Sequence, residues 1–206
     1  MSTVHTAQLR AKRVEPTWEV AEFFTAEGVW SEEEYLALDT NRRVEFTDGC
    51  VEVLTVPTII HQRIGAYLYR MLFAFVSQYN LGEVLYAGVR TRLRPGMFRE
   101  PDIVFKLAQH AARAGEDYWE GADLVMEIVS AGAEDRERDL QRKRMEYAAA
   151  GIPEYWIIDP KLARITVLRL EGDHYVAHGE FKPGEQASSV LLKGFTVDVA
   201  AALSAK

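Results

Sequence analysis

The chain has a single cysteine, Cys50, among its 206 residues. One thiol cannot form an intrachain disulfide or supply the several thiolates of a cysteine-rich zinc site. Disulfide frameworks belong to oxidising compartments, so a reducing cytoplasm is the expected location. Residues 1–13 lack the apolar core of a signal peptide, and no apolar run approaches the length of a membrane span. We therefore expect a soluble, cytoplasmic protein that does not enter a membrane.

Positive charge is also in short supply, with 24 Lys and Arg residues against 31 Asp and Glu residues and a formal net charge of −7. Nonspecific binders of nucleic acid usually carry an obvious positive excess, so this balance argues against indiscriminate binding to polyanions. It remains compatible with a local basic surface. Carboxylates that gather around a metal ion also make the overall charge a poor guide to a metal-loaded site.

The sequence contains neither an internal repeat nor a low-complexity segment, and its length fits one domain with a substantial core. Residues up to about Ala26 are polar and weakly patterned, and we assign residues 1–30 to an N-terminal extension. Residues 31–206 form the domain.

Several local patterns predict individual elements. The capping box Ser31-Glu32-Glu33-Glu34 begins a short helix that ends near Leu38. Asp48-Gly49 predicts a hairpin between two strand-like runs. Apolar residues at helical spacing predict a long helix over about 58–79.

The rest of the chain alternates between strand and helix patterns. A helix is expected at 135–150, ended by Gly151-Ile152-Pro153, and strands are expected at 82–93, 99–105, 124–130, 154–159, 164–170 and 174–178. The order of helix, three strands, helix and strand, with a β-rich tail, indicates an α/β (α+β) domain. Its centre would be a mixed β-sheet flanked by helices.

Two short apolar runs each carry one carboxylate among β-branched residues that favour burial. Asp102 precedes Ile103-Val104-Phe105, and Glu127 interrupts the run 124–129. A carboxylate in such a strand is costly to desolvate unless positive charge lies opposite it. On neighbouring strands the two could share one divalent cation, and the following helix supplies Lys143. Metal-assisted phosphodiester hydrolysis requires these parts.

At these residues the chain resembles the PD-(D/E)XK nuclease superfamily, because Pro101-Asp102 and Glu127 stand in its order after a long first helix. More narrowly, residues 31–200 resemble the Uma-two family of inferred restriction endonucleases, formerly a domain of unknown function. The narrower resemblance is carried by Glu45 before Asp48-Gly49, His61, Pro101-Asp102-Ile103, Glu127-Ile128-Val129-Ser130, Asp139, Lys143, Tyr147 and the run from Gly151 to Pro160.

The resemblance implies a restriction-endonuclease-like core and a metal site. In that site Asp102, Glu127 and the backbone carbonyl of Ile128 would hold Mg²⁺ or Mn²⁺ through oxygen ligands. Neither His61 nor Cys50 should be a ligand, because Mg²⁺ prefers hard oxygen donors.

One position departs from the superfamily pattern. The superfamily usually places its lysine two residues after the second carboxylate, where this chain has Val129. The family resemblance implies that Lys143 reaches the site from the next helix instead. Helical spacing permits this, because Leu140, Lys143 and Tyr147 fall on one stripe of that helix.

Each candidate also has an ordinary structural interpretation. Asp102 could fix a turn at a strand end, and Asp139 with Lys143 has the i, i+4 spacing common on helix surfaces. Glu45 suits a cross-strand pair, and His61 suits a helix cap. We keep Glu45, His61 and Asp139 as supporting residues of the site, with Asp139 as the residue that orients Lys143.

The leading hypothesis is a metal-dependent endonuclease-like hydrolase that cuts phosphodiester bonds in nucleic acid, with DNA as the expected substrate. Lys143 would hold the attacking water or stabilise the developing negative charge. A homodimer is expected by analogy, because cutting both strands of a duplex commonly takes two sites related by a two-fold axis. The alternative is a nuclease-fold protein without turnover that binds nucleic acid or protein.

Overall fold

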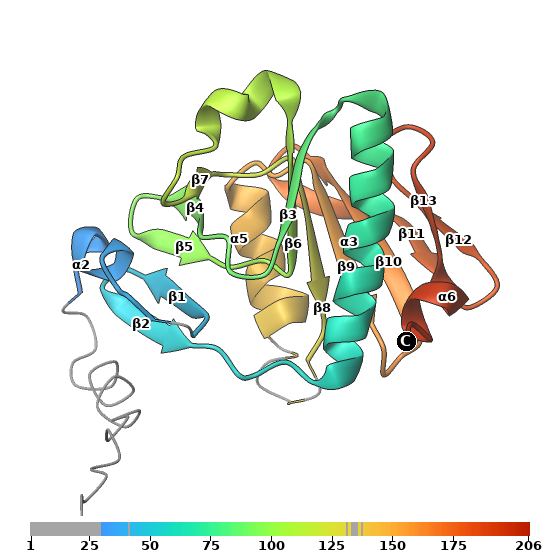
Figure 1. Ribbon diagram of the computed structural model, residues 1–206, viewed down its shortest axis with the longest axis horizontal. Helices are drawn as coiled ribbons and strands as arrows, with labels where there is room; N and C mark the ends of the chain where they lie inside the picture. The colour runs from blue at the N-terminus through green and yellow to red at the C-terminus, as the bar shows by residue number, and fades with distance from the viewer. Residues whose placement is uncertain (1–29, 41, 131, 133–135, 137) are drawn as a thin grey trace, which may run out of the picture.

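The computed structural model describes residues 30–40, 42–130, 132, 136 and 138–206 (Figure 1). Apart from Trp30, the expected N-terminal extension lies outside the described residues. The first helix, α2 (Glu32–Leu36), has the predicted capping box. Its Ser31 Oγ accepts a hydrogen bond from Glu34 N at 3.1 Å, and Glu34 Oε2 accepts one from Ser31 N at 2.8 Å.

A small sheet follows, with five strands in the order β2-β1-β5-β4-β7. The predicted hairpin is confirmed, because Asp48 and Gly49 both have positive φ, 47° and 88°, as a type I′ turn requires. Tyr35 of α2 packs on this sheet with its ring centroid 5.1 Å from those of Phe46 and Phe98. The strands are β1 (Val44–Thr47), β2 (Cys50–Val53), β4 (Thr91–Arg94), β5 (Met97–Arg99) and β7 (Trp119–Glu120).

The central sheet has six strands in the order β11-β10-β9-β8-β6-β3. Strands β8 and β9 pair in parallel and the other neighbours pair antiparallel, so the sheet is mixed, as predicted. Its strands are β3 (Gly82–Tyr86), β6 (Ile103–Leu107), β8 (Leu124–Ile128), β9 (Glu154–Asp159), β10 (Arg164–Glu171) and β11 (His174–Phe181).

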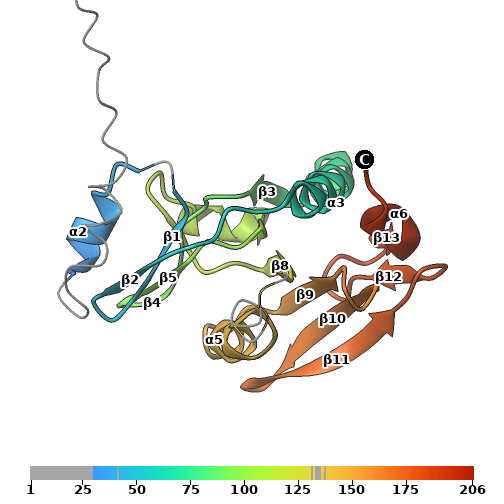
Figure 2. The ribbon, with the colours of Figure 1, turned by 90° about the horizontal axis from the view of Figure 1, so that it is seen from below.

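Helices cover both faces of the central sheet (Figure 2). On one face lies α3 (Ile59–Tyr79), which begins at Thr58 and buries Ile64, Leu68 and Leu72, with α6 (Val199–Leu203) beside it. A separate two-stranded sheet of β12 (Gln186–Ser188) and β13 (Thr196–Asp198) completes that layer. On the other face lie the π-helix η2 (Arg138–Arg142) and α5 (Lys143–Ala149). A 3₁₀ helix, η1 (Ala108–Arg113), follows β6.

Two segments expected as single strands are each divided between the two sheets. Segment 82–93 forms β3 and β4, because Ala87 and Gly88 between them adopt left-handed conformations, with φ 43° and 80°. Segment 99–105 is divided between β5 and β6 around Pro101, which has no N–H to donate to a strand ladder. The second break leaves Asp102 immediately before β6.

The helix expected at 135–150 is also more irregular than its pattern indicates. From Arg138 it runs as the π-helix η2, continues as α5 and ends before Gly151, which has φ 73°. Asp135 lies outside the described residues. Among the helices of the described residues, none has both the length and the apolar character needed to cross a bilayer.

Candidate active site

Asp102 and Glu127 lie on the same face of the central sheet, at neighbouring positions. In the β6–β8 pairing Ile103 is opposite Met126, so Asp102 stands one step further along, beside Glu127. Side chains alternate between the faces of a sheet, and Val104 and Val125 both belong to the core beneath α5. The two carboxylates therefore come together on the face of the sheet that α5 covers, where β6 begins and β8 ends. The shared-cation hypothesis requires this arrangement.

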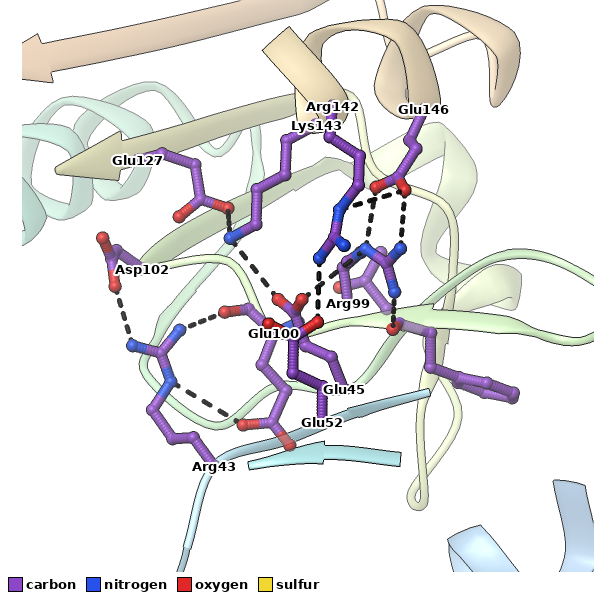
Figure 3. Close-up of polar contacts among 12 residues, drawn as sticks. Arg43, Glu45, Glu52, Arg99, Glu100, Asp102, Glu127, Arg142, Lys143 and Glu146 are labelled. Carbon is purple, nitrogen blue, oxygen red and sulfur yellow. Dashed lines mark hydrogen bonds and ion pairs between the residues drawn. The ribbon is translucent and has the colours of Figure 1, made fainter. Parts of the chain in front are cut away.

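Lys143 supplies a positive charge in direct contact with Glu127. Its Nζ lies 2.9 Å from Glu127 Oε1, and the lysine side chain is only 2% exposed (Figure 3). The hydroxyl of Tyr147, one turn further along α5, donates a hydrogen bond of 2.6 Å to the same oxygen. The ammonium thus points at Glu127 and away from solvent. It is predicted to serve both Asp102 and Glu127, and of these two it directly contacts only Glu127 within the described residues.

Glu45 joins this cluster from the small sheet. It is fully buried in β1, and its Oε1 lies 3.4 Å from Lys143 Nζ. Arg99 of β5 lies on its other side, with Nε 3.6 Å from Glu45 Oε2, and pairs with Glu146 of α5 through two contacts of 2.8 and 2.6 Å. Glu45 therefore faces two cations, Arg99 from the neighbouring strand β5 of its own sheet and Lys143 from α5, so a cross-strand contact and a contact with the site coexist.

Asp102 is surrounded by hydrogen-bond donors. Its Oδ2 accepts from the backbone N of Ile128 at 2.8 Å and lies 3.0 Å from His61 Nε2, and its Oδ1 accepts from Arg43 Nη1 at 2.9 Å. Burial alone would raise the pKa of this carboxyl. The hydrogen bond and charge of His61, with the charges of Arg43 and Lys143, outweigh burial and hold the pKa of Asp102 below its usual range.

His61 has two separate connections at the start of α3. Its backbone N donates to Thr58 Oγ1 at 3.3 Å, while its imidazole reaches Asp102. Burial lowers the pKa of His61, but the hydrogen bond to Asp102 and the charge of that carboxylate raise it above its usual value. The helix-cap interpretation therefore describes the backbone of His61, and its ring belongs to the site.

A small cavity of about 20 Å³ opens between these side chains and is large enough for one water molecule or ion. A larger hollow of about 240 Å³ shares part of its wall, including His61, Ile128 and Ser130. The small cavity is lined by Arg43, Leu54, Thr55, Pro57, His61, Asp102, Glu127, Ile128, Ser130 and Lys143.

The lining contains the donor set expected for a hard cation. Asp102, Glu127 and Ile128 all border the small cavity, and oxygen ligands suit Mg²⁺, which keeps several waters and needs few protein ligands. Within the described residues, three or more His, Cys, Asp or Glu side chains do not group into a metal site. The expected set contains only two such side chains, and Cys50 is exposed in β2.

Most of the residues that line the candidate site are predicted from the sequence. Two residues of the site have no predicted role, and one predicted residue is an exception. Arg43, which contacts Asp102 and Glu100, and the hydroxyl of Tyr147 were not assigned roles, although Tyr147 lies four residues after Lys143 on the predicted stripe. Asp139 is the exception, because its side chain lies outside the described residues.

Sequence comparison matches residues 32–200 to the Uma2 family, described as "Putative restriction endonuclease". This match covers well over half of the chain and agrees with the resemblance carried by its motifs. No curated protein sequence matches the chain.

Among solved structures, the chain is similar to a crystal structure described as a "putative nuclease belonging to DUF820" from Anabaena variabilis ATCC 29413. The TM-score is 0.69 and the identity 16%, over 84% of this chain and 99% of that chain, so the two share a fold. The type IIG restriction endonuclease BpuSI matches with a TM-score of 0.40 and 15% identity, over 73% of this chain and 18% of that chain. That likeness is too low to add to the fold assignment.

Proposed function

The chain belongs to the Uma2 family, and from this membership and the geometry of the site we propose that it is a divalent-metal-dependent nuclease. Its substrate would be nucleic acid, with DNA as the first choice, and the reaction would be hydrolysis of a phosphodiester bond. The observation that carries the proposal is the buried contact between Lys143 Nζ and Glu127 Oε1, beside Asp102 at one small cavity.

The carboxylates of Asp102 and Glu127 and the backbone carbonyl of Ile128 would hold Mg²⁺ or Mn²⁺. The chemistry that such a cation supplies is a lowered pKa of bound water and neutralised charge on the phosphate. The low pKa of Asp102 keeps this carboxylate ionised near neutral pH, as a metal ligand must be. No rearrangement of strands is needed to bring the two carboxylates together, because β6 and β8 already pair.

Lys143 would hold the attacking water by a hydrogen bond from its ammonium, or stabilise negative charge that develops on the phosphate. Glu45 positions this ammonium from the small sheet, and Tyr147 holds the Glu127 carboxylate from α5. His61 and Arg43 do the same for Asp102. Asp139 stays a predicted supporting residue.

Two further parts of the proposal concern the oligomeric state and the location in the cell. A homodimer would place two such sites on the two strands of a duplex. The proposed location is the cytoplasm, where nucleic acid is accessible.

A second candidate is a nuclease-fold binding module without turnover. It is favoured by the contacts of Asp102, because both of its carboxylate oxygens already accept hydrogen bonds from donors of the chain itself. A metal would have to compete with Arg43 and His61 for them. Metal binding without cleavage would support this candidate.

A cleavage assay with added Mg²⁺ or Mn²⁺ tests the proposal on single-stranded and duplex DNA and RNA. We expect metal-dependent cleavage that is lost in Glu127→Gln and Asp102→Asn and stopped by EDTA. Cleavage that persists in Glu127→Gln, or none on any substrate with either metal, would contradict it.

The chain offers a matched control for Asp102. Asp123 is equally buried, lies 2.8 Å from the ring of His110 and accepts a backbone hydrogen bond of 2.8 Å from Leu107, but it lies at the other end of β6. Asp123→Asn removes the same charge from similar surroundings. It should leave cleavage unchanged, which separates the role of Asp102 from a general effect of losing a buried carboxylate.

A further inference from the structure

Three aromatic side chains form a cluster of tilted rings beside the candidate site, with Phe73 and Tyr86 exposed and Tyr69 half-buried between them, and we call them the aromatic platform. Tyr69 and Phe73 lie one turn apart on α3, and Tyr86 ends β3. The ring centroid of Tyr69 is 4.6 Å from that of Tyr86 and 5.6 Å from that of Phe73. Tyr86 is 52% exposed and Phe73 49% exposed. The platform therefore offers large ring surfaces to solvent.

The platform begins at the edge of the site. Tyr86 is opposite Ile103 in the β3–β6 pairing, and the backbone N of the next residue, Ala87, donates to the carbonyl of Asp102 at 3.0 Å. Tyr86 also lines an opening of about 30 Å³ together with Asp102 and His61. Tyr86 therefore connects the platform to the opening beside Asp102.

Two exposed arginines accompany the platform on α3. Arg63 and Arg70 lie seven residues apart, about 10 Å along the helix, on the stripe next to Tyr69 and Phe73. Within the part of the chain that the structure describes, neither makes an ion pair. In a protein with a net charge of −7, two such arginines beside exposed rings suit an anionic aromatic ligand.

From this geometry we infer that the aromatic platform binds unpaired nucleotides of the strand whose phosphate lies at Asp102. The bases stack on Tyr86 and Phe73, which Tyr69 supports from between them, and the phosphates pair with Arg63 and Arg70. The inference rests on the proposed nuclease function and adds its substrate class, a single-stranded or locally unpaired nucleic acid. Rings of this kind bind bases of any sequence, because every base has a stacking face, whereas paired bases in a duplex keep their faces covered.

A second copy of the chain is the competing occupant. β3 is an edge strand of the central sheet, and an exposed edge can pair with another chain. The charges favour nucleic acid, because two like copies would bring Arg63 and Arg70 toward one another. The test therefore includes the oligomeric state.

The experiment measures binding of the full chain to a fluorescent single-stranded DNA and to the matching duplex, by anisotropy in EDTA, so that cleavage plays no part. We expect the single strand to bind more tightly. Tyr86→Ala and Phe73→Ala should each weaken single-strand binding about 10-fold, and Tyr86→Trp should retain it. Arg63→Gln and Arg70→Gln should each lower the salt dependence by about 0.7 in the slope of log K against log salt.

Tyr79→Ala is the matched aromatic control, because Tyr79 is 55% exposed at the far end of the same helix and contacts Phe75 instead. Lys193→Gln is the control for a surface charge. Both should bind as the wild type does, and thermal unfolding checks that each variant is folded.

The inference is overturned by equal affinity for duplex and single strand, or by wild-type binding in both Tyr86→Ala and Phe73→Ala. It is also overturned if these variants convert a dimer into monomers in sedimentation without weakening DNA binding. Failure of the proposed nuclease function would give a different result. The protein would bind the single strand tightly and depend on Tyr86 for it, but it would not cleave with any metal. If the platform variants cleave as the wild type does, the nuclease function is supported and the role of the platform in substrate binding is contradicted.

Discussion

Lys143 Nζ lies 2.9 Å from Glu127 Oε1, although the lysine comes from α5 and the glutamate from β8. A superfamily lysine two residues after Glu127 would stand at Val129. Val129 belongs to the core on the α5 side of the sheet, together with Tyr147, so a lysine there would extend toward the same region. The helix therefore delivers an ammonium to the face of the sheet that the missing strand lysine would serve.

Replacing Lys143 tests this arrangement. We expect Lys143→Met to abolish cleavage and to retain the fold. The free energy of unfolding should fall by about 3 kcal/mol, because Glu127 and Glu45 stay buried without their shared cation. Lys143→Arg should rescue poorly, since a planar guanidinium does not fit the place of a compact ammonium. Single-turnover cleavage and urea unfolding measure the two effects.

Lys106→Met is the control for losing a buried lysine. Lys106 donates hydrogen bonds of 2.9 Å to the backbone carbonyls of Arg113 and Glu120, away from the site. The Lys106→Met variant should cleave at the wild-type rate. Cleavage at the wild-type rate by Lys143→Met would instead show that another group positions the water.

The Tyr147 hydroxyl is expected to support Glu127 without taking part in the chemistry. Tyr147→Phe removes a buried hydrogen bond to a carboxylate and should cost about 2 kcal/mol of unfolding free energy. Cleavage should slow far less than in Lys143→Met, because the ammonium remains. Tyr175→Phe is the control, since its hydroxyl donates to the Ile152 carbonyl. A Tyr147→Phe variant as inactive as Lys143→Met would assign the chemistry to the hydroxyl.

Divalent metal should stabilise the folded protein. Saturating Mg²⁺ at about 100 times its dissociation constant should add about 2.7 kcal/mol to the free energy of unfolding, because the unfolded chain lacks the site. The melting temperature measured with and without Mg²⁺ gives the effect, and EDTA should reverse it. Glu127→Gln should lose most of the shift, and Asp123→Asn should keep it. An equal shift in Glu127→Gln would place the metal elsewhere.

The pH dependence of stability has a component from Lys106, away from the site. Burial lowers the pKa of Lys106 to about 8 from its ordinary value of 10.5. Between these values the unfolded chain holds a proton that the folded chain has lost, so stability should rise with pH over this interval. Urea unfolding at about pH 7.5, 9 and 10.5 spans the window set by that pKa shift. The free energy of unfolding of the wild type should rise relative to that of Lys106→Met as the pH increases. A constant difference between the two would contradict the shift.

The sequence predicts the elements of this fold better than their partners. Asp48-Gly49 and Ser31 to Glu34 act through local geometry, so the hairpin and capping box form as predicted. Segment 82–93 misled because its two halves have the same strand character, while the break depends on backbone conformations at Ala87 and Gly88 that a local pattern does not reveal.

The candidate site shows the same limit. Asp102 and Glu127 could be singled out because each carboxylate adjoins an apolar run. Lys143 could be singled out through its helical stripe with Leu140 and Tyr147 and through the family resemblance. Arg43 could not, since it is an ordinary arginine before a strand until β1 is docked against β5. Contacts between the two sheets come from tertiary packing, and single-chain periodicity does not encode them.

The shared ammonium of Lys143 has a consequence for how the protein is made. Synthesis runs from the N-terminus, so Glu45, Asp102 and Glu127 are all added to the chain before Lys143. A nascent or prematurely terminated chain that stops short of α5 holds three carboxylates and lacks the cation that joins two of them. Truncated products of translation that end before α5 would thus lack the proposed activity.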